Sequence, residues 1–453
     1  MSDPAVPRLN ASRFVAVTVL ERVIDKGAYA SLALDAELSR ARLNPRDAAL
    51  ATEIVYGTLR VLPALDAVIA AHVTQDPARM DGFARAALRS AAYQLAHLGR
   101  LPTHAIVDET VSIVRGKRGP RLGGFVNAVA RKLAAQRAAA PEPARALIVP
   151  DWFRKLLETS LGAARAGQFL EQRALPPPLC LRTEAGAAAR AALRERIQAA
   201  MPDAEVADCL VSPLGISMRR AGAPRALAGY AEGEFSVQEE GSQLVGLALG
   251  VQAGDRVADV CAGHGGKSTL FARLTGEPGR VLAIDRDERK LERIAPELQR
   301  LKLPTKRVDT MALDLTVGAG GLGADFDRVL VDAPCTGLGT VHRRPELLLR
   351  LSEQDPTRLA QLQLGILQRA SGLVRVGGVV AYAVCSPSTA EGAGVAEAFE
   401  REAPAFERIR EPLAGAFVAP DADGIVRIGP WLVPEGTVAC PDAYQIALWK
   451  RVR

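Results

Sequence analysis

Four short apolar runs, each leading into a polar or reactive residue, constrain the fold of this chain more than any other feature. They are rich in Val, Ile, Leu and Ala and occupy residues 256–260, 280–285, 326–332 and 379–385. Helical segments separate them, and the longest, at 359–374, carries an apolar stripe that we expect Gly377-Gly378 to terminate. This alternation predicts an α/β fold with a doubly wound parallel sheet, which binds ligands beyond the carboxyl ends of its strands.

The first third of the chain shows helical periodicity instead. After Ser12, which fits a helix N-cap, apolar residues recur at spacings of three and four, beginning with Phe14 and Val17. Similar stripes continue to Leu133 with few strand signals between them. We therefore predict an all-α bundle within residues 1–140.

Two further segments separate this bundle from the strand-rich region. Residues 134–150 are rich in Ala, Pro and Arg and poor in large apolar side chains, which predicts a linker. The next elements are a helix at 152–161, a proline break at 176–178, a strand at 179–183, a helix at 187–200 and strands at 204–211 and 215–219. They predict a small α/β module over residues 150–233, ahead of the doubly wound domain at 234–453.

Length and composition agree with several globular domains. At roughly 150 residues a domain, 453 residues correspond to about three, and 48% apolar with 24% charged residues is typical of soluble proteins. No run approaches the ~18 consecutive apolar residues of a membrane-spanning helix. Residues 1–10 contain Asp3 and two prolines and lack the apolar core of a signal peptide. We expect a cytoplasmic protein with no membrane association.

The six cysteines are too sparse for a disulfide framework, and their spacing matches no zinc site. We therefore expect free thiols and no metal. Cys180, Cys209 and Cys440 lie away from the predicted strand ends and are expected to be inert.

The positive charge is concentrated at the amino-terminal end. Residues 1–140 hold 19 Lys and Arg against 12 Asp and Glu, whereas the remainder holds 38 against 39. This excess indicates an acidic partner such as RNA, although a merely soluble basic domain has the same composition. The predicted contact is a loop between two helices, carrying the basic side chains of Arg115, Lys117, Arg118 and Arg121.

A glycine-rich loop follows the first predicted strand, with the sequence Cys261-Ala262-Gly263-His264-Gly265-Gly266-Lys267-Ser268. A phosphate-binding P-loop requires glycine at position 261, so that motif fails. A dinucleotide fingerprint beginning at Gly263 requires Gly or Ala at position 268 and fits only in part. Asp285 ends the next strand, where a carboxylate can hold ribose hydroxyls. The pair indicates a nucleoside cofactor without pyrophosphate, such as S-adenosylmethionine.

Two cysteines stand at the ends of two other predicted strands. Cys335 follows Asp332-Ala333-Pro334, and Cys385 precedes Ser386. The alternative is that both are small buried hydrophobes, the commoner fate of a free cysteine. At neighbouring strand ends, however, two thiols can converge on one substrate atom.

Methylation at C5 of cytosine is a reaction that uses two such groups. A thiolate adding at C6 makes C5 nucleophilic, and a second group must then remove the C5 proton. In a protonated or hydrogen-bonding form, Asp332 can stabilise the N3 position as charge develops there.

These residues resemble the RsmB/Fmu (Sun) family of bacterial small-subunit ribosomal RNA cytosine-C5 methyltransferases. Besides the cofactor loop and both cysteine motifs, the similar segments are residues 53–60, 102–105, 109–111, 124–129 and 235–243. The resemblance covers nearly the whole chain. It implies a Rossmann-like S-adenosylmethionine-dependent methyltransferase domain, preceded by an all-α NusB-like RNA-binding bundle and a small α/β module on the substrate side.

The resemblance also implies roles for single residues. Cys385 would be the nucleophile and Cys335 would assist proton removal and release. Asp285 would bind the ribose of S-adenosylmethionine, Asp314 its adenine, and Asp332 and the loop 261–267 would complete the site. The substrate would be a cytidine of 16S ribosomal RNA, free or in a partly assembled subunit, and Arg343-Arg344-Pro345-Glu346 would form a substrate-side loop.

Three positions depart from the family pattern. His264 replaces a proline, Gly392 replaces the asparagine after the acidic residue Glu391, and Ala443-Tyr444-Gln445 replaces Gly-Phe-Phe. Two alternatives therefore stay open at this point. One is an RNA-binding assembly or antitermination factor with a vestigial methyltransferase domain, and the other is the same chemistry on transfer RNA.

Overall fold

The computed structural model describes residues 11–453, apart from residues 75, 138–148, 173–175, 184 and 414–416. By its internal contacts the chain divides into two compact units. The first contains Met1–Pro150, Arg173–Pro176 and Val341–Arg350. The second contains Asp151–Gln172, Pro177–Thr340 and Leu351–Arg453. Of the predicted linker, residues 134–137 are helical and 138–148 lie outside the described residues.

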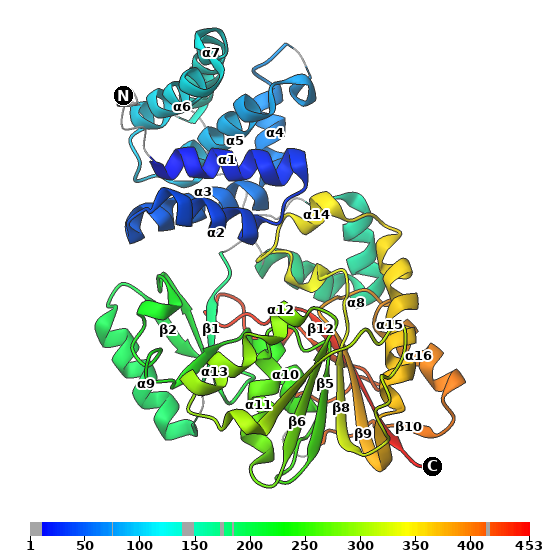
Figure 1. Cartoon of the computed structure of the whole chain (residues 1–453). Coiled ribbons are helices and arrows are strands. Elements are labelled where there is room, and N and C mark those ends of the chain that lie inside the picture. The colour runs from blue at the N-terminus through cyan, green and yellow to red at the C-terminus, as the bar shows by residue number, and fades with distance from the viewer. Residues whose placement is uncertain (1–10, 75, 138–148, 173–175, 184, 414–416) are drawn as a thin grey trace. The chain divides into compact units, whose positions relative to one another are not determined.

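Helices make up the amino-terminal part of the first unit (Figure 1). They are α1 (Ala11–Lys26), α2 (Ala30–Ala41), α3 (Pro45–Arg60), α4 (Leu62–Ala70), α5 (Gly82–His97), α6 (Thr103–Arg118) and α7 (Pro120–Arg137). Their apolar faces meet in one core that includes Leu20, Ile54 and Phe83, as the periodicity predicted. The side chains of Asn44 and Asp81 accept hydrogen bonds from main-chain N–H groups in the first turns of α3 and α5.

The predicted basic loop is wrong. Gly119, with φ +89°, alone separates α6 from α7, so the basic residues lie in the last turn of one helix and the first turn of the next. Arg118 is ion-paired with Glu21 and Asp81. The glycines at positions 116 and 119 suggested a loop, but a single left-handed residue is enough to end a helix.

The second unit begins with α8 (Asp151–Gln172) and a four-stranded antiparallel sheet. Gly162, with φ +76°, kinks α8, which is longer than the predicted helix. The sheet has the order β2-β3-β1-β4 and is formed by β1 (Leu179–Thr183), β2 (Glu205–Asp208), β3 (Gly215–Arg219) and β4 (Phe235–Val237). Helix α9 (Ala187–Ala200) packs Leu193 and Ile197 into the same core as Phe235. The predicted bounds of β1, β3 and α9 are confirmed.

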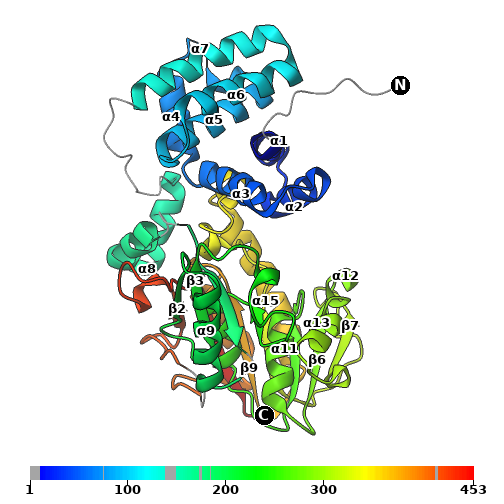
Figure 2. The same ribbon diagram turned by 90° about the vertical axis from the view of Figure 1, so that its left-hand side faces the viewer.

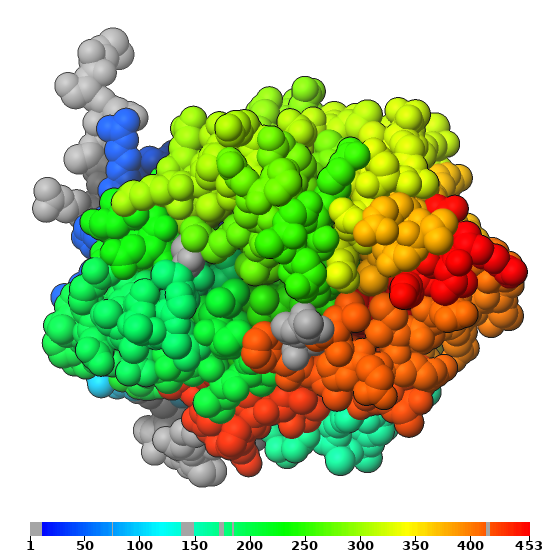
Figure 3. Space-filling model, turned by 90° about the horizontal axis from the view of Figure 1, so that it is seen from below, coloured from blue at the N-terminus to red at the C-terminus, as the bar shows by residue number. Residues whose placement is uncertain are grey.

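A larger, eight-stranded sheet has the order β10-β12-β9-β8-β5-β6-β7, with β11 paired to β12. The strands are β5 (Arg256–Val260), β6 (Arg280–Asp285), β7 (Val308–Ala312), β8 (Phe326–Asp332), β9 (Val374–Val384), β10 (Phe406–Arg408), β11 (Val426–Ile428) and β12 (Tyr444–Arg451). Strands β5 to β9 pair in parallel, and β12 runs antiparallel to β9. In the space-filling view, the red carboxyl-terminal segment lies beside the orange segment that contains its partner β10 (Figure 3).

Helices cover both faces of this sheet (Figures 1 and 2). They are α10 (Glu240–Ala248), α11 (Gly266–Thr275), α12 (Glu288–Leu291), α13 (Ile294–Arg300), α15 (Asp355–Ser371) and α16 (Ala393–Glu402). Alternate strand residues enter two separate cores: Val257 packs with Phe271 of α11, and its neighbour Ala258 packs with Leu367 of α15. This two-sided burial explains why the strands are continuous apolar runs, and it confirms the doubly wound fold.

The remaining elements are short. They are helix α14 (Leu347–Arg350), in the first unit, and the 3-10 helices Pro77–Arg79, Pro224–Ala226, Thr305–Arg307, Leu338–Thr340 and Pro430–Leu432. In the part of the chain that the structure describes, no helix has the length and apolarity needed to cross a membrane.

The end of α15 differs from the prediction. Gly377 and Gly378 do not terminate this helix, which ends at Ser371, because both glycines lie inside β9. Strand β9 begins at Val374, five residues earlier than its apolar run, so its first half is not visible as a buried strand in the sequence.

Candidate active site

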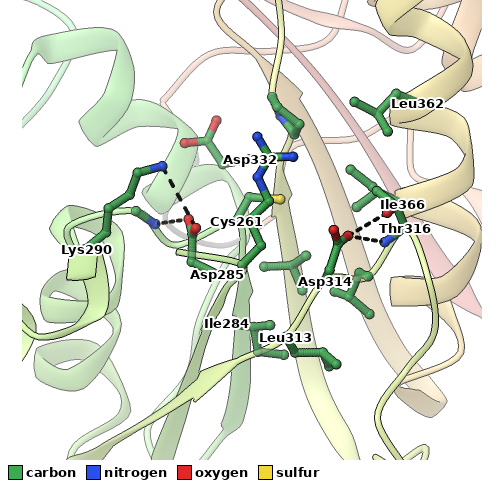
Figure 4. Close-up of a pocket in the computed structure, with 15 residues that line it drawn as sticks. Cys261, Ile284, Asp285, Lys290, Leu313, Asp314, Thr316, Asp332, Leu362 and Ile366 are labelled. Carbon is green, nitrogen blue, oxygen red and sulfur yellow. Dashed lines mark hydrogen bonds and ion pairs between the residues drawn. The ribbon is translucent and has the colours of Figure 1, made fainter. Parts of the chain in front are cut away.

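The predicted site residues lie where β5, β6, β8 and β9 end. Strand β5 lies between β6 and β8 in the sheet. The chain runs from β5 through β6 to β7 on one side of β5, and then crosses to β8 and β9 on the other side. Such a switch point opens a crevice at the carboxyl ends of the strands. A pocket is found there, lined by residues of the Cys261 loop, by Asp285, Asp314 and Asp332, and by several apolar side chains (Figure 4).

Asp285 is fixed at the end of β6 by main-chain donors. Its Oδ2 accepts a hydrogen bond of 2.9 Å from the N–H of Gly263, and its Oδ1 accepts one of 2.9 Å from Asp287. Lys290 Nζ lies 3.9 Å from Oδ1. The carboxylate is buried and lines the pocket, in a position where it can accept hydrogen bonds from ribose hydroxyls.

Asp314 lines the same pocket from the segment after β7 (Figure 4). Its Oδ1 accepts hydrogen bonds from the Oγ1 and main-chain N–H of Thr316, at 2.6 and 2.8 Å, and these lower the pKa of the carboxyl. Ile284 and Ile366 contribute apolar wall. Carboxylates beside an apolar wall fit a nucleoside, with polar groups for the sugar and a flat surface for the base.

The glycine loop brings its main chain close to this pocket. Cys261 has φ +62°, a left-handed conformation that is uncommon for a side chain larger than glycine, and Ala262 N–H donates to the carbonyl of Ile284 at 2.9 Å. Gly265 has φ +78°, and a Cβ there would collide with Ile294. Gly266 then begins α11. The loop therefore turns tightly, and Cys261 and Gly263 line the pocket.

Two titratable side chains of the loop, those of Cys261 and His264, are neutral near pH 7. Burial, with the nearby carboxylates of Asp332 and Asp285, raises the pKa of Cys261 to about 12. Desolvation and the cations Arg293 and Lys290 lower the pKa of His264. Cys261 is thus a protonated thiol in the pocket wall.

Lys267 and Asp332 form an ion pair, with Nζ 2.5 Å from Oδ2. Burial lowers the pKa of Lys267, but the charge and hydrogen bond of Asp332 outweigh it, and the net shift is upward. The ammonium therefore stays charged and holds the carboxylate. Asp332 also lines a second cavity with Lys267, Glu239 and Tyr444, so it faces both spaces.

Asp259 is a buried carboxylate that the sequence analysis missed. It lies in β5, accepts a 2.6 Å hydrogen bond from Ser268 Oγ, and has a pKa raised by burial to about 6. The available signal was a charged residue within an otherwise apolar strand. Because side chains alternate along a strand, Asp259 points toward the face opposite to that of Ala258 and Val260.

The sulfur atoms of Cys335 and Cys385 lie 3.3 Å apart, although the residues are 50 positions apart in the chain. The parallel pairing of β8 with β9 brings the two strand ends together. The carbonyl of Cys385 also accepts a 3.0 Å hydrogen bond from the N–H of Gly339, which joins the two loops directly. The hydrogen bond with Cys385, together with burial, raises the pKa of Cys335 well above its usual value.

Arg182, in strand β1, reaches the cofactor loop from the small sheet. It is fully buried and donates to the carbonyl of Gly266 at 2.6 Å, to Gln238 Oε1 at 2.7 Å and to Thr269 Oγ1 at 3.1 Å. The sequence analysis did not predict this contact, because Arg182 and Gly266 are 84 positions apart in the chain and no sequence pattern relates them.

The predicted substrate-side loop, residues 343–346, lies in the first unit. Glu346 is buried, and its Oε1 accepts a 3.2 Å hydrogen bond from Ala30 N–H at the start of α2. Cys180, Cys209 and Cys440, predicted to be inert, are buried. Within the described ranges, no group of three or more His, Cys, Asp and Glu side chains is arranged to hold a metal ion.

Comparison with known proteins gives a consistent result. Residues 246–428 match the family described as 16S rRNA methyltransferase RsmB/F, and residues 10–135 match the NusB family. A protein named as a methyltransferase in Mycobacterium tuberculosis is 36% identical over 416 residues, which cover 87% of each chain. Ribosomal RNA small subunit methyltransferase B of Vibrio cholerae is 33% identical over 405 residues, covering 86% of this chain and 89% of that protein.

Solved structures agree on the fold. The crystal structure of PH0851 superposes with a TM-score of 0.78 at 21% identity, covering the whole of both chains. NSun6 from Pyrococcus horikoshii gives a TM-score of 0.54 at 17% identity, over 67% of this chain and 99% of that one.

The doubly wound sheet, its nucleoside pocket and the matched families define an S-adenosylmethionine-dependent RNA methyltransferase. More narrowly, the chain belongs to the RsmB/F family, whose members methylate cytosine at C5, and it carries a NusB-type domain at its amino-terminal end.

Proposed function

We propose that this enzyme methylates C5 of one cytidine in 16S ribosomal RNA through a covalent bond between Cys385 and C6 of the base. The observation that carries the proposal is the 3.3 Å separation of the Cys335 and Cys385 sulfurs. Asp332 at the end of the neighbouring strand lines both the cofactor pocket and the second cavity. We assign the cytosine to that second cavity.

The bond changes balance as follows. The Cys385 thiolate forms a bond to C6, and the displaced electron pair makes C5 nucleophilic. S-adenosylmethionine, when bound, supplies the methyl group from its sulfonium. Removal of the C5 proton then restores the double bond between C5 and C6, and Cys385 leaves as a thiolate.

The electrostatics of the sulfur pair support this division of labour. The hydrogen bond with Cys385 and burial raise the pKa of Cys335 well above its usual value, so the Cys335 thiol keeps its proton near pH 7. To act as the base, Cys335 must first release its own proton to solvent, and the thiolate that results accepts the C5 proton and returns to the thiol. Its sulfur lies 3.3 Å from the sulfur of Cys385. We therefore assign Cys335 to removal of the C5 proton and to release.

Asp332 and Lys267 are assigned to stabilisation of the base. Asp332 is held by the charged Lys267, which fixes the carboxyl at the boundary of the two cavities. Negative charge develops around N3 when the thiolate adds to C6. The Lys267 ammonium offsets this charge, and Asp332 stabilises it when its carboxyl carries a proton and donates a hydrogen bond. Asp285 and Asp314 bind the ribose and adenine of the cofactor.

We assign RNA binding to residues 1–140 and catalysis to residues 234–453, with the module at 150–233 on the substrate side. A hollow in the helical bundle is lined by five cationic side chains and two acidic ones: Arg22, Lys26, Arg40, Lys117, Arg118, Glu21 and Glu37. Lys26 and Lys117 are exposed, and among the described residues no ion pair is found for either. They suit contacts to phosphate. Action on ribosomal RNA would place the enzyme in the cytoplasm.

The test uses the Cys335→Ala protein with unmodified 16S ribosomal RNA and labelled S-adenosylmethionine. Without the group that completes release, a protein–RNA adduct should accumulate on a denaturing gel and disappear when Cys385→Ala is added. Cys209→Ala, which removes a buried thiol far from the pair in sequence, is the matched control. An adduct that survives Cys385→Ala refutes the assignment. An adduct that forms with transfer RNA and not with 16S RNA changes the substrate, and absence of cofactor binding favours a vestigial domain.

A further inference from the structure

Glu391 is a buried carboxylate that accepts hydrogen bonds from the residue that follows each of the two cysteines. Its side chain has no exposed surface. It lies in the turn after β9, six residues beyond Cys385 and 56 beyond Cys335 in the chain. A charge this deeply buried is stable only if hydrogen bonds replace its hydration.

Four hydrogen bonds do so. Oε1 accepts from Thr336 N–H at 2.8 Å and from Gln363 Nε2 at 3.0 Å, and Oε2 accepts from Thr336 Oγ1 at 2.6 Å and from Ser386 Oγ at 2.5 Å. Thr336 directly follows Cys335, and Ser386 directly follows Cys385. One carboxylate therefore holds the residue next to each cysteine.

Helix α15 and strand β9 brace the same group. Gln363 of α15 also donates to the carbonyl of Pro334 at 3.0 Å, and Tyr382 of β9 donates to the main-chain carbonyl of Glu391 at 2.5 Å. The side chains that form this network are buried: Thr336, Gln363, Tyr382, Ser386 and Glu391. The network thus connects α15, β9 and the loop after β8 beside the two sulfurs.

We propose that Glu391 is a positioning residue that sets the separation of the Cys335 and Cys385 sulfurs through its hydrogen bonds. It contacts neither cofactor nor substrate and acts by fixing Thr336 and Ser386. The part that concerns release of methylated RNA rests on the function proposed above, whereas the sulfur separation does not.

The chemistry of the four donors makes a specific prediction. The two groups at Oε1 are N–H donors, which require an acceptor, but the two at Oε2 are hydroxyls, which can accept as well as donate. Glu391→Gln can place its oxygen at Oε1 and its NH₂ at Oε2, with both hydroxyls reversed. If Glu391 works through hydrogen bonds, this variant restores most of what Glu391→Ala loses.

The first experiment measures the sulfur pair without RNA. Diamide oxidises two adjacent thiols to a disulfide, taking two electrons and two protons to become a hydrazine, and the rate of Cys335–Cys385 disulfide formation is followed by peptide mapping. We expect Glu391→Ala to slow this reaction on the order of tenfold or more, since effective concentration falls steeply when two groups lose alignment. Glu391→Gln and the exposed control Glu397→Ala should stay within about threefold of the wild type.

The second experiment measures methyl transfer. A misplacement of about 1 Å can cost on the order of 100-fold in rate, so Glu391→Ala should lower kcat by that order while the cofactor Kd, from calorimetry, changes little. It should also raise the ratio of trapped adduct to released product, which simple loss of folded protein does not do. If Glu391→Ala does not fold, Thr336→Val removes one donor to Oε2 and should show a smaller effect of the same kind.

Two results overturn the proposal. Equal defects in Glu391→Gln and Glu391→Ala indicate that the negative charge matters and not the geometry. A normal disulfide rate in a folded Glu391→Ala or Thr336→Val protein shows that the network does not hold the sulfurs. Failure of methyl transfer in the wild type, with the disulfide results as expected, rejects the proposed function and leaves the positioning role intact.

Discussion

The side-chain amide of Gln445 fills the space into which a Cβ on Gly392 would project. Its Nε2 donates to the carbonyls of Ser386 and Ser388, at 3.0 and 2.8 Å, and so holds the turn that follows Cys385. Both positions depart from the pattern of the family that the chain resembles. In the structure the two positions are in contact, and the absence of a side chain at Gly392 leaves room for the amide of Gln445 from β12.

We predict that Gly392→Asn and Gln445→Ala are strongly coupled. The first forces Gln445 out of its place and the second leaves two buried carbonyls without it, so each should destabilise the fold by about 1–3 kcal/mol. Together they should cost less than the sum, because the collision no longer exists. Urea unfolding of the single and double variants measures the coupling. Strict additivity would show that the two positions act independently.

Arg182 gives a second prediction, since it links the small sheet to the cofactor loop. Arg182→Lys keeps the charge but loses the planar fork that reaches Gly266, Gln238 and Thr269 together. We expect the Kd for S-adenosylmethionine to rise about tenfold, which corresponds to ~1.4 kcal/mol. Calorimetry measures it, with the exposed Arg225→Lys of the same module as the control. Unchanged affinity in Arg182→Lys would assign Arg182 to stability alone.

Asp259 predicts a pH dependence of stability. Its pKa is about 6 in the folded protein against an ordinary 3.8, so between these values the folded state holds a proton that the unfolded chain has released. The penalty for the buried charge is therefore absent below about 3.8, grows as pH rises and is complete above about 6. Its full size is on the order of 3 kcal/mol.

Urea midpoints between about pH 4.5 and 8 test this prediction. The free energy of unfolding of the wild type, relative to that of Asp259→Asn, should fall as pH rises toward about 6. The same comparison with Asp309→Asn, which changes an exposed aspartate on β7, should not follow that curve. A difference for Asp259→Asn that is flat over this range would contradict the assignment.

The sequence predicted the features that depend on residues close together in the chain, such as the bounds of strands and the residues at their ends. Strands β5, β6 and β8 were placed at their observed bounds, because a strand buried on both faces is rich in Val, Ile, Leu and Ala and is followed or ended here by a polar or reactive residue. Parallel strands then bring Asp285, Asp332, Cys335 and Cys385 to one edge. Position along a strand was therefore enough to assemble the reacting groups.

Contacts across long separations could not be predicted in this way. Glu391 bonding to Thr336, and Arg182 to Gly266, depend on side-chain directions that no periodicity encodes. The end of α15 was misplaced because the glycines that resembled a helix stop lie inside β9. A basic loop was predicted where there is none, because a single glycine with positive φ, Gly119, connects α6 to α7.

Lys26 and Lys117 give the last prediction, on how RNA is held by residues 1–140. Each has an exposed ammonium beside the hollow in the bundle, and binding to phosphate releases counterions, so affinity should fall with salt concentration. Charge reversal to Glu at either position should weaken RNA binding and reduce the slope of log K against log salt by about 1. Lys132→Glu changes an exposed lysine of the same domain that does not line the hollow, and it should leave the slope nearer to that of the wild type. Equal changes in all three variants would indicate that only the net charge of the domain matters and that the hollow is not the contact.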